Sequence, residues 1–509
     1  MTQPVKTIML LGTGSDVGKS IAAAAFCRIL KRRGFKVAPF KAQNMSNNSF
    51  VTVEGGEIGR AQVVQAEAAG LLPSSDMNPV LLKPTSGLGS QVVVQGRVYG
   101  QMQAAEYHHS KKRLVGAVME SFHRLASRFE VIVIEGAGSC VEINLRANDI
   151  VNFAMARRVQ APCLLVADID RGGVFAQIIG AMTLMTRREK ELTRGFIINK
   201  FRGDPALFED GVRMIEQRTR RPIFGVVPFY ERIFIDPEDS VAVQTDKRPI
   251  RPTRPDHLNV AVVRLPGISN FTDMEALERE PDVLLNYLFR PDRLDSYDLV
   301  ILPGTKNTIE DAVWLKRSRW SRWILDYAAR GGSIIGLCGG YQILGRHIYD
   351  PLGVESTRKR VSGLGLLPVS TTLEGDKVLR RVTGVDLVSG PRVQGYEIHM
   401  GRTMRDEDGD RADGSATPLL KIRRPGEGPA WEDGWSADGG RVLGTYVHGL
   451  LDSPAWRKDY LNRLRRAKGL AERKQSAPAR RARFHQYDLL ADHFEAHVDV
   501  PAILEVMGL

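Results

Sequence analysis

The sequence predicts an α/β protein with two doubly wound, mostly parallel sheets, one in each half of the chain. Short apolar runs alternate with helical patterns from residue 6 to about 235, and the alternation resumes at residue 258. This alternation is typical of parallel strands that helices cover on both faces. A charged, proline-rich stretch at residues 244–256 can neither fill a core nor continue a helix, so it separates the two halves.

The expected strands follow in order along both halves. In the first half they are Thr7–Leu11, Val37–Phe40, Val131–Ile134, Pro162–Ala167 and Gly195–Ile198. In the second half they are Leu258–Arg264, Leu299–Pro303 and Ser333–Leu337. We therefore predict a first domain over residues 1–240, a linker over 241–257, a second domain over 258–455 and a short helical C-terminal tail over 456–509.

Composition excludes several classes of protein. The 509 residues carry a formal charge of +12, but the basic residues are scattered and not interleaved with aromatic ones, which argues against nucleic-acid binding. A basic protein also attracts small polyanions such as ATP. Four cysteines without a Cys-x-x-Cys pair predict neither a disulfide framework nor a thiolate zinc site, which suits the reducing cytoplasm. No apolar run approaches the roughly 18 residues of a membrane helix.

A glycine-rich loop follows the first predicted strand and ends in Gly-Lys-Ser. It departs from the strict P-loop pattern, which would place glycine at Thr13. Backbone N–H groups and the positive end of the next helix would still face a phosphate, with Lys19 at the terminal phosphates and Ser20 on magnesium. The alternative is a turn without a ligand. The predicted nucleotide-binding residues are Gly12, Thr13, Gly14, Gly18, Lys19 and Ser20.

Two further polar groups follow predicted strands of the first half. Lys41, Gln43 and Asn44 come after the second strand, where open α/β sheets bind ligands, although such clusters are often only polar loops. Glu135 closes the third strand, and its carboxylate suits a magnesium site shared with Ser20.

A third polar group ends the next strand. Asp168 and Asp170 are candidates for substrate contacts, and Arg171 can grip a carboxylate or a phosphate. The simpler interpretation of each aspartate is a helix N-cap.

The second half carries a cysteine at a turn between strand and helix. Gly336-Leu-Cys338-Gly-Gly340 has the form of a nucleophile elbow, and a helix starting there would favour the thiolate. His448 follows another short strand and is the candidate base. Backbone N–H groups of Gly339 and of the turn at Gly304 are the candidate oxyanion donors. The alternative is an inert buried cysteine.

Together these motifs resemble the cobyric acid synthase family over nearly the whole chain. The resemblance rests on residues 39–48, 167–173, 302–307, 336–341 and 395–401 together with His448. It implies a P-loop NTPase domain similar to dethiobiotin synthetase, fused to a flavodoxin-like class I glutamine amidotransferase domain. It also implies that Cys338 is the glutaminase nucleophile and His448 its base.

One position departs from the pattern of triad amidotransferases. These enzymes usually carry a glutamate two residues after the histidine, where this chain has Leu450. Glu397 or Asp452 could orient His448 instead, or the pair could work unaided.

The resemblance implies ATP- and glutamine-dependent amidation of the b, d, e and g carboxylates of adenosylcobyrinic acid a,c-diamide, a corrinoid of cobalamin biosynthesis. It implies ATP, Mg²⁺ and small-molecule substrates, and neither a tightly bound cofactor nor a nucleic-acid or membrane partner. Three alternatives stay open: cobyrinic acid a,c-diamide synthase, a fused cell-wall amidotransferase, and a regulatory nucleotide-switch ATPase of the partitioning type. The last would leave Cys338 without a role.

Overall fold

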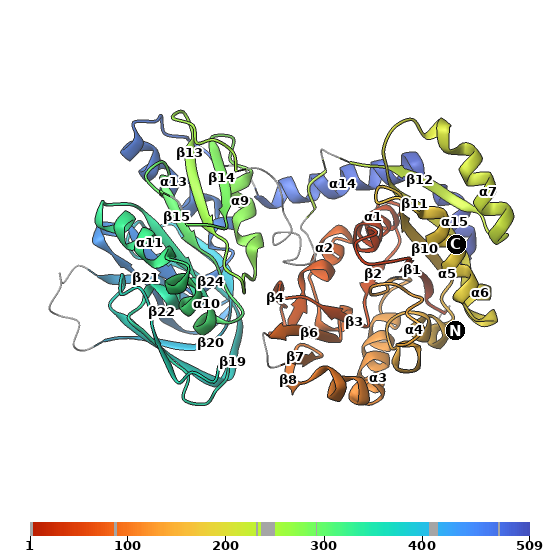
Figure 1. Cartoon of the computed structure of the whole chain (residues 1–509), viewed down its shortest axis with the longest axis horizontal. Coiled ribbons are helices and arrows are strands. Elements are labelled where there is room, and N and C mark those ends of the chain that lie inside the picture. The colour runs from red at the N-terminus through yellow and green to blue at the C-terminus, as the bar shows by residue number, and fades with distance from the viewer. Residues whose placement is uncertain are drawn as a thin grey trace.

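The computed structural model describes residues 4–85, 89–230, 233–235, 250–291, 293–406, 416–476 and 479–509. Within these residues the chain forms two α/β domains that lie side by side (Figure 1). Residues 241–249 of the predicted linker lie outside the described residues. The predicted α/β class with parallel sheets is confirmed.

The first domain is built on a six-stranded sheet in which every neighbouring pair is parallel. Its spatial order is β12-β11-β10-β1-β9-β2. The strands are β1 (Lys6–Gly12), β2 (Val37–Phe40), β9 (Val131–Glu135), β10 (Cys163–Asp168), β11 (Thr193–Phe201) and β12 (Ile223–Pro228).

Alternate side chains of these strands pack into two separate cores, one on each face of the sheet. Met9 and Leu11 belong to one core, whereas Ile8 and Leu10 belong to the other. Because both faces are covered, the strands are apolar throughout rather than alternating. The helices of this domain are α1 (Lys19–Arg32), α2 (Arg60–Ala68), α3 (Ala104–Ala126), α4 (Phe153–Val159), α5 (Val174–Leu184), α6 (Arg187–Leu192) and α7 (Glu209–Thr219).

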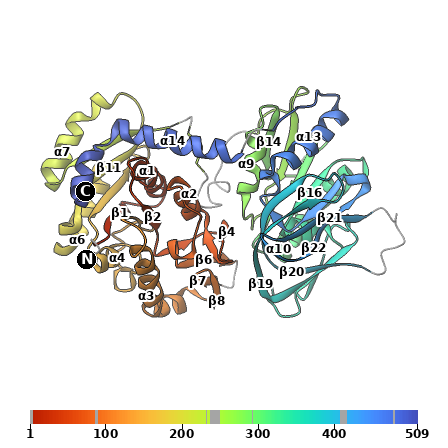
Figure 2. The same cartoon turned by 180° about the vertical axis from the view of Figure 1, so that it is seen from behind.

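Two small sheets on the first domain face the second domain (Figures 1 and 2). One has the order β3-β6-β7-β8, and the other pairs β4 with β5. Their strands are β3 (Gln43–Met45), β4 (Ser49–Val51), β5 (Glu57–Gly59), β6 (Val80–Thr85), β7 (Gly89–Val94) and β8 (Arg97–Met102). The segment after β2 therefore leads from the large sheet to the neighbouring domain.

The second domain contains a larger sheet with a parallel half and an antiparallel half. The parallel half runs β14-β13-β15-β16-β23, and β22, β21, β19 and β20 extend it in antiparallel pairs. The parallel strands are β13 (Leu258–Val263), β14 (Val283–Leu288), β15 (Leu299–Leu302), β16 (Ile334–Leu337) and β23 (Val442–Thr445). The others are β17 (His347–Tyr349), β18 (Arg360–Ser362), β19 (Val369–Asp386), β20 (Arg392–Arg405), β21 (Thr417–Arg424), β22 (Glu427–Ala437) and β24 (Val447–His448).

Helices again cover both faces of the parallel strands. Val300 and Leu302 pack into one core, and Leu299 and Ile301 pack into the other. The covering elements are the 3-10 helix η4 (Phe271–Met274), α9 (Glu275–Glu278), α10 (Thr308–Arg317), α11 (Trp320–Ala329), α12 (Gly339–Leu344) and α13 (Pro454–Lys468).

The residues predicted as one tail divide between the two domains. α13 buries Trp456 and Leu461 in a core of the second domain. α14 (Ala479–His497) and α15 (Val500–Met507) instead bury Phe494 and Ile503 in a core of the first domain. Each helix has an apolar face that must be buried, and each packs on the nearest sheet. Both termini therefore lie at the first domain, with α14 running between the two domains (Figure 2).

No helix within the described residues has the length and apolarity needed to cross a membrane.

Candidate functional site

The predicted phosphate loop joins β1 to α1, and two of its glycines are required by close contacts. A Cβ at Gly18, where φ is +99°, would lie 2.0 Å from Nδ2 of Asn199. A Cβ at Gly12 would lie 2.6 Å from Nζ of Lys19. The ammonium of Lys19 donates to the carbonyls of Gly14 (2.8 Å) and Gly138 (2.9 Å), which holds it over the loop. This is the position from which a lysine reaches terminal phosphates.

Glu135 accepts hydrogen bonds from several polar side chains around this loop. Its Oε1 accepts hydrogen bonds from Oγ of Ser20 (2.7 Å) and from Nζ of Lys41 (2.8 Å). Its Oε2 accepts from Nε2 of Gln65 (2.6 Å) and of Gln62 (3.3 Å). The carboxylate is fully buried, so it depends on these donors. The structure thus brings three predicted residues together, whereas the two α2 glutamines carried no sequence signal.

Ser20 and Glu135 fit the requirements of a magnesium ion. Both offer hard oxygen ligands, and the two oxygens lie 2.7 Å apart. Adjacent ligands in an octahedron with bonds of about 2.0–2.1 Å are separated by about 2.9 Å. Magnesium usually takes few protein ligands and completes its shell with waters and phosphates. Within the described ranges, no group of three or more His, Cys, Asp and Glu side chains could hold a metal.

Gln43 and Asn44 are buried amides that follow β2. Asn44 donates from Nδ2 to Oε1 of Gln62 (2.9 Å), which itself contacts Glu135. Gln43 accepts a hydrogen bond from the hydroxyl of Tyr107 (2.7 Å). Asn44 therefore belongs to the hydrogen-bond network around Glu135, whereas Gln43 is a buried amide that pairs with Tyr107.

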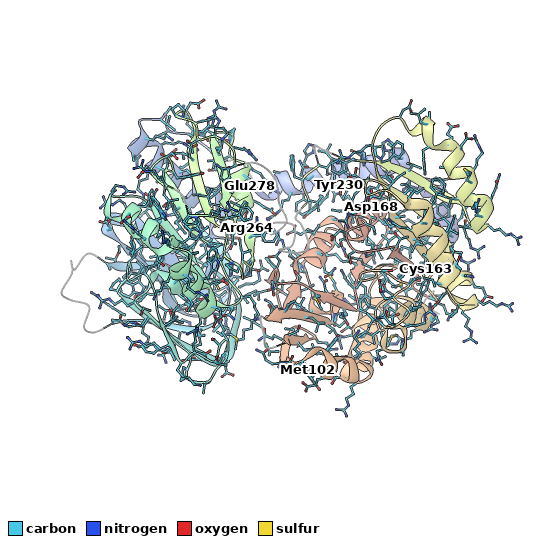
Figure 3. All side chains as sticks on the ribbon, viewed as in Figure 1. Met102, Cys163, Asp168, Tyr230, Arg264 and Glu278 are labelled. Atoms are coloured by element: carbon cyan, nitrogen blue, oxygen red, sulfur yellow. The ribbon has the colours of Figure 1, made fainter. Side chains whose placement is uncertain are left out.

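Asp168, Asp170 and Arg171 form a separate polar group at the end of β10; Figure 3 labels Asp168. Asp168 is buried and pairs with Nζ of Lys200 (2.8 Å), while Asp170 pairs with Arg202 (2.7 Å). Arg171 is 61% exposed and lies 3.4 Å from Asp16 of the phosphate loop. This group borders the loop, and Lys200 and Arg202 are the cations that the sequence analysis missed.

Cys338 lies at a strained turn between β16 and α12. Its φ of +51° and ψ of −108° lie outside the regions that ordinary side chains adopt. Its N–H donates to the carbonyl of Thr445 (2.8 Å), and its thiol donates to the carbonyl of Ile398 (3.4 Å). Strain of this kind, held by surrounding packing, is typical of a nucleophile elbow.

His448 is oriented by a carboxylate that the sequence analysis did not consider. Nδ1 of His448 lies 2.7 Å from Oδ2 of Asp273, whose Oδ1 accepts from the N–H of Gly449 (2.8 Å). Asp273 and His448 are separated by 175 residues, and no local spacing links them. Of the two carboxylates proposed from sequence, Glu397 pairs with Arg380 and Asp452 pairs with Arg483.

The surroundings of His448 determine its charge. Burial lowers the pKa of the imidazole, but the charge of Asp273, its hydrogen bond and the neighbouring Cys338 outweigh burial and raise the pKa to about 10. Tyr396 stacks on the ring with centroids 5.4 Å apart. The three side chains Cys338, His448 and Asp273 are therefore arranged as a nucleophile, a base and an orienting acid.

The two glycines predicted to provide oxyanion donors lie beside these side chains. A Cβ at Gly304 would lie 3.2 Å from Cε1 of His448, and a Cβ at Gly339 would lie 2.5 Å from the Thr305 methyl group. The turn at residues 304–305 thus contacts both the histidine and the elbow. A side chain at Gly339 would require the elbow to shift, and one at Gly304 would be a tight contact.

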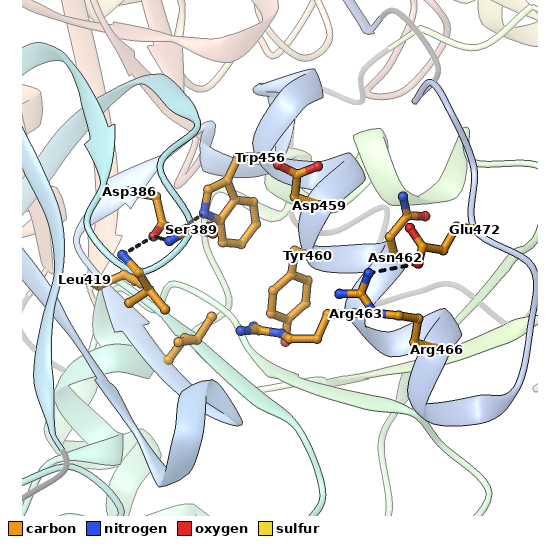
Figure 4. A pocket seen from close by; sticks show the side chains of 12 residues that line it. Asp386, Ser389, Leu419, Trp456, Asp459, Tyr460, Asn462, Arg463, Arg466 and Glu472 are labelled. Atoms are coloured by element: carbon orange, nitrogen blue, oxygen red, sulfur yellow. Dashed lines mark hydrogen bonds and ion pairs between the residues drawn. The ribbon is translucent and has the colours of Figure 1, made fainter.

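Two of the cavities that the described residues line lie in the second domain. The larger, of about 560 Å³, reaches the elbow region at Tyr341 and Tyr446 and contains both acids and cations. The smaller, of about 260 Å³, lies along α13, where Trp456 stacks on Tyr460 (Figure 4). None of the predicted site residues lines the smaller cavity.

Comparisons with known proteins assign the two domains to two different families of domain. Residues 8–242 match the model of the CobQ/CobB/MinD/ParA nucleotide binding domain, and residues 259–456 match the CobB/CobQ-like glutamine amidotransferase domain. The chain is 50% identical to the cobyric acid synthase of Syntrophobacter fumaroxidans, with 99% of each chain covered. It is 46% identical to those of Chlorobaculum tepidum (99% and 98% covered) and Photorhabdus laumondii (98% of each).

Proposed function

The chain belongs to the cobyric acid synthase family of glutamine-dependent amidating ligases, and we propose that it amidates the b, d, e and g carboxylates of adenosylcobyrinic acid a,c-diamide. One observation carries the proposal: a phosphate loop with its lysine lies in one domain, and a cysteine elbow with a charge-paired histidine lies in the other. These two sites supply the two half-reactions that an amidation by glutamine needs.

The first domain would activate the acid. A carboxylate resists attack by ammonia, so one of its oxygens first attacks the γ-phosphorus of ATP, and ADP leaves. Lys19 would neutralise the charge that develops on the transferred phosphoryl group. Ser20 and Glu135 would hold magnesium, which neutralises phosphate charge when bound. The product of this half-reaction is an acyl phosphate.

Lys41 would take part in the same half-reaction. Its ammonium shares one carboxylate oxygen with Ser20, so a ligand that displaces it from Glu135 gains a cation for a phosphate or a substrate carboxylate. We assign Gln43, Asn44, Asp168, Asp170 and Arg171 to the substrate side of this site, as proposed from the sequence.

The second domain would release the ammonia. The Cys338 sulfur attacks the side-chain carbonyl of glutamine, and His448 transfers the thiol proton to the leaving ammonia. The backbone N–H groups at Gly339 and the Gly304 turn would stabilise the oxyanion. Water then hydrolyses the thioester to glutamate, which frees Cys338. The ammonia attacks the acyl phosphate and expels phosphate.

We infer that the amino and carboxylate groups of glutamine bind in the cavity of about 560 Å³. Its lining includes Glu397 and Asp433 as well as Arg380 and Arg402, and a free amino acid needs a partner of each sign. Ile398, whose carbonyl accepts the Cys338 thiol, lies beside Glu397 on β20. This proximity supports the cavity as the glutamine site.

Ammonia must travel between the domains without being lost to solvent, and the domain contact suits an enclosed path. Nζ of Lys377 in the second domain lies 2.5 Å from Glu57 of the first, and both side chains are at most 6% exposed. Burial lowers the pKa of Lys377 to about 7, despite the opposing charge of Glu57. A buried interface of this kind excludes bulk water.

The alternatives make different predictions. Cobyrinic acid a,c-diamide synthase would act on the a and c carboxylates, and a nucleotide switch would hydrolyse ATP without consuming glutamine. The geometry of Cys338, His448 and Asp273 argues against the switch, because a regulatory ATPase has no use for an oriented nucleophile.

Mass spectrometry of the corrinoid tests the proposal. With Mg-ATP and glutamine we expect four stepwise conversions of acid to amide on adenosylcobyrinic acid a,c-diamide. A Cys338→Ser variant should lose the reaction with glutamine and keep it with ammonia, because only the first nucleophile is missing. Conversion of cobyrinic acid to its diamide would instead favour the related synthase, and ATP turnover without any mass change would reject a corrinoid substrate.

A further inference from the structure

A chain of buried hydrogen bonds crosses the domain interface and ends at His448. The N–H of Ser49 donates to Oδ1 of Asn270 (3.0 Å), and the N–H of Asn270 donates to Oδ1 of Asn48 (2.9 Å). Nδ2 of Asn270 lies 3.3 Å from Nε2 of His448. Asn48, Ser49 and Asn270 are at most 5% exposed. The Asn270 side chain therefore connects the backbone of the first domain to Nε2 of His448, the ring nitrogen that does not face Asp273.

These bonds fix which way the Asn270 amide points. A backbone N–H can only donate, so Oδ1 must face Ser49 and the amide NH₂ must face His448. Because an NH₂ group is only a donor, Nε2 of His448 must be the acceptor. The ring then carries its proton on Nδ1, toward Asp273. This contact therefore favours an unprotonated Nε2 whose lone pair faces the Asn270 amide.

The contact with Asn270 and the other neighbours of the His448 ring have opposite effects on its protonation. Asp273 on η4 and Cys338 before α12 both favour a protonated imidazole, and Tyr396 on β20 covers its face. Transfer of the Cys338 proton to Nε2 requires a free lone pair and creates an N–H for which the Asn270 amide offers no acceptor. Among these neighbours, Asn270 is the group that resists formation of the thiolate–imidazolium pair.

We propose that Asn270 is a positioning residue that restrains His448 while Asn48 and Ser49 hold it, so that full glutamine hydrolysis requires this domain contact to loosen. The inference rests on the proposed function of Cys338 and His448 and adds the means by which the first domain controls them. The amide cannot turn in place, since Oδ1 would then leave the Ser49 N–H unpaired. Release therefore requires movement of the segment that carries Asn48 and Ser49.

That segment also belongs to the activation site. It begins at Lys41, which binds Glu135 beside the phosphate loop, so a ligand that draws Lys41 away acts on the same stretch of backbone. In addition, Nδ2 of Asn48 and Oδ1 of Asn47 are buried without hydrogen-bond partners. Unpaired buried polar atoms cost free energy, which a rearrangement that pairs them would recover. The unpaired atoms thus favour movement of the segment that carries Asn48 and Ser49.

Glutamate release from glutamine alone, without ATP or corrinoid, tests the restraint. We compare the wild type with Asn48→Ala, which removes the acceptor for the Asn270 N–H, and with Asn270→Gly, which suits the φ of +50° at this position. Each variant loses one hydrogen bond of the restraint, worth about 1.4 kcal/mol. We therefore expect the kcat for glutamine hydrolysis to rise about tenfold and the KM for glutamine to stay within about twofold of the wild type. In the complete reaction, more glutamate should form per amide.

Two matched variants separate the restraint from general damage to the interface. Asn48→Asp keeps an acceptor oxygen and should behave like the wild type. Gln91→Leu removes the interdomain bonds to Lys306 and Lys377 but no contact of Asn270, and it should also leave uncoupled hydrolysis unchanged. Equal increases in all four variants would overturn the inference, because any loosening of the interface would then suffice.

Other outcomes are equally distinct. Unchanged or slower hydrolysis in both Asn48→Ala and Asn270→Gly, with native melting curves, would overturn the restraint and leave the proposed function standing. Hydrolysis that survives Cys338→Ser would overturn the proposed function, and this inference with it.

Discussion

The two sites of this molecule are assembled in different ways. The nucleotide site is mostly local, since residues 12–20 form one loop between β1 and α1. The cysteine site gathers Asp273, Gly304, Cys338 and His448 from four separate segments. The loop site needs only backbone N–H groups and a lysine to bind phosphate, whereas the cysteine site needs side chains in a fixed mutual geometry. A local motif therefore shows the loop of the first site, whereas it shows only separate members of the second.

The largest effect should come from the nucleotide site. Lys19→Met keeps the length of the side chain but removes the charge held over the loop, so we expect amidation to fall about 10²- to 10³-fold with either glutamine or ammonia. Glutamate release should persist, because Cys338 is unaffected. Corrinoid mass spectrometry measures amidation, and a glutamate assay measures glutamine hydrolysis. Cys338→Ser should give the opposite pattern, and equal loss of both activities in Lys19→Met would show that the sites are not separable.

A smaller effect should follow from Asp273→Asn in the cysteine site. The amide would donate to Nδ1 of His448 and favour the wrong tautomer, so we expect glutaminase kcat to fall about 10²-fold while amidation with ammonia stays normal. Asp273 raises the pKa of His448, so its loss lowers that pKa and moves the alkaline limb of the glutaminase pH profile to lower pH. An unshifted alkaline limb would contradict the assigned role.

The same substitution should change stability in a pH-dependent manner. The pKa of His448 is raised from 6.5 to about 10 in the folded chain. A raised pKa contributes stability that is fully present below pH 6.5 and is lost as pH rises through about 10. Asp273→Asn should therefore destabilise the second domain most below pH 6.5. Thermal melts at several pH values, with the wild type as reference, measure the difference.

The smallest effect on chemistry should come from Leu450→Glu, which restores the glutamate that triad amidotransferases usually carry. Asp273 already occupies Nδ1 of His448, and Leu450 is only 2% exposed in an apolar core. A buried carboxylate without a partner costs about 1–3 kcal/mol or more, so we expect lower stability and no gain in glutaminase activity. Leu450→Met is the matched control. A gain in activity would show that the orienting position is vacant.

The sequence alone determined the fold class and located the motifs that depend on immediate neighbours. Alternating apolar runs predicted two parallel sheets, because a strand buried on both faces must be apolar throughout. The Gly-Lys-Ser loop and the glycines around Cys338 were visible because tight turns restrict local backbone geometry. The contacts of Ser20 and Lys41 with Glu135 followed the expectation that ends of parallel strands share one edge.

Only the tertiary structure decided which distant groups meet. Asp273 contacts His448 across 175 residues, and α14 packs on the first domain rather than beside α13. Asn48 and Asn270 pair across the domain interface, so neither domain's sequence encodes the contact alone. Each of these contacts depends on how packed helices and strands place side chains that share no local sequence pattern. The reason is physical: backbone propensity and periodicity act over a few residues, whereas burial and hydrogen-bond satisfaction act on whatever the fold brings together.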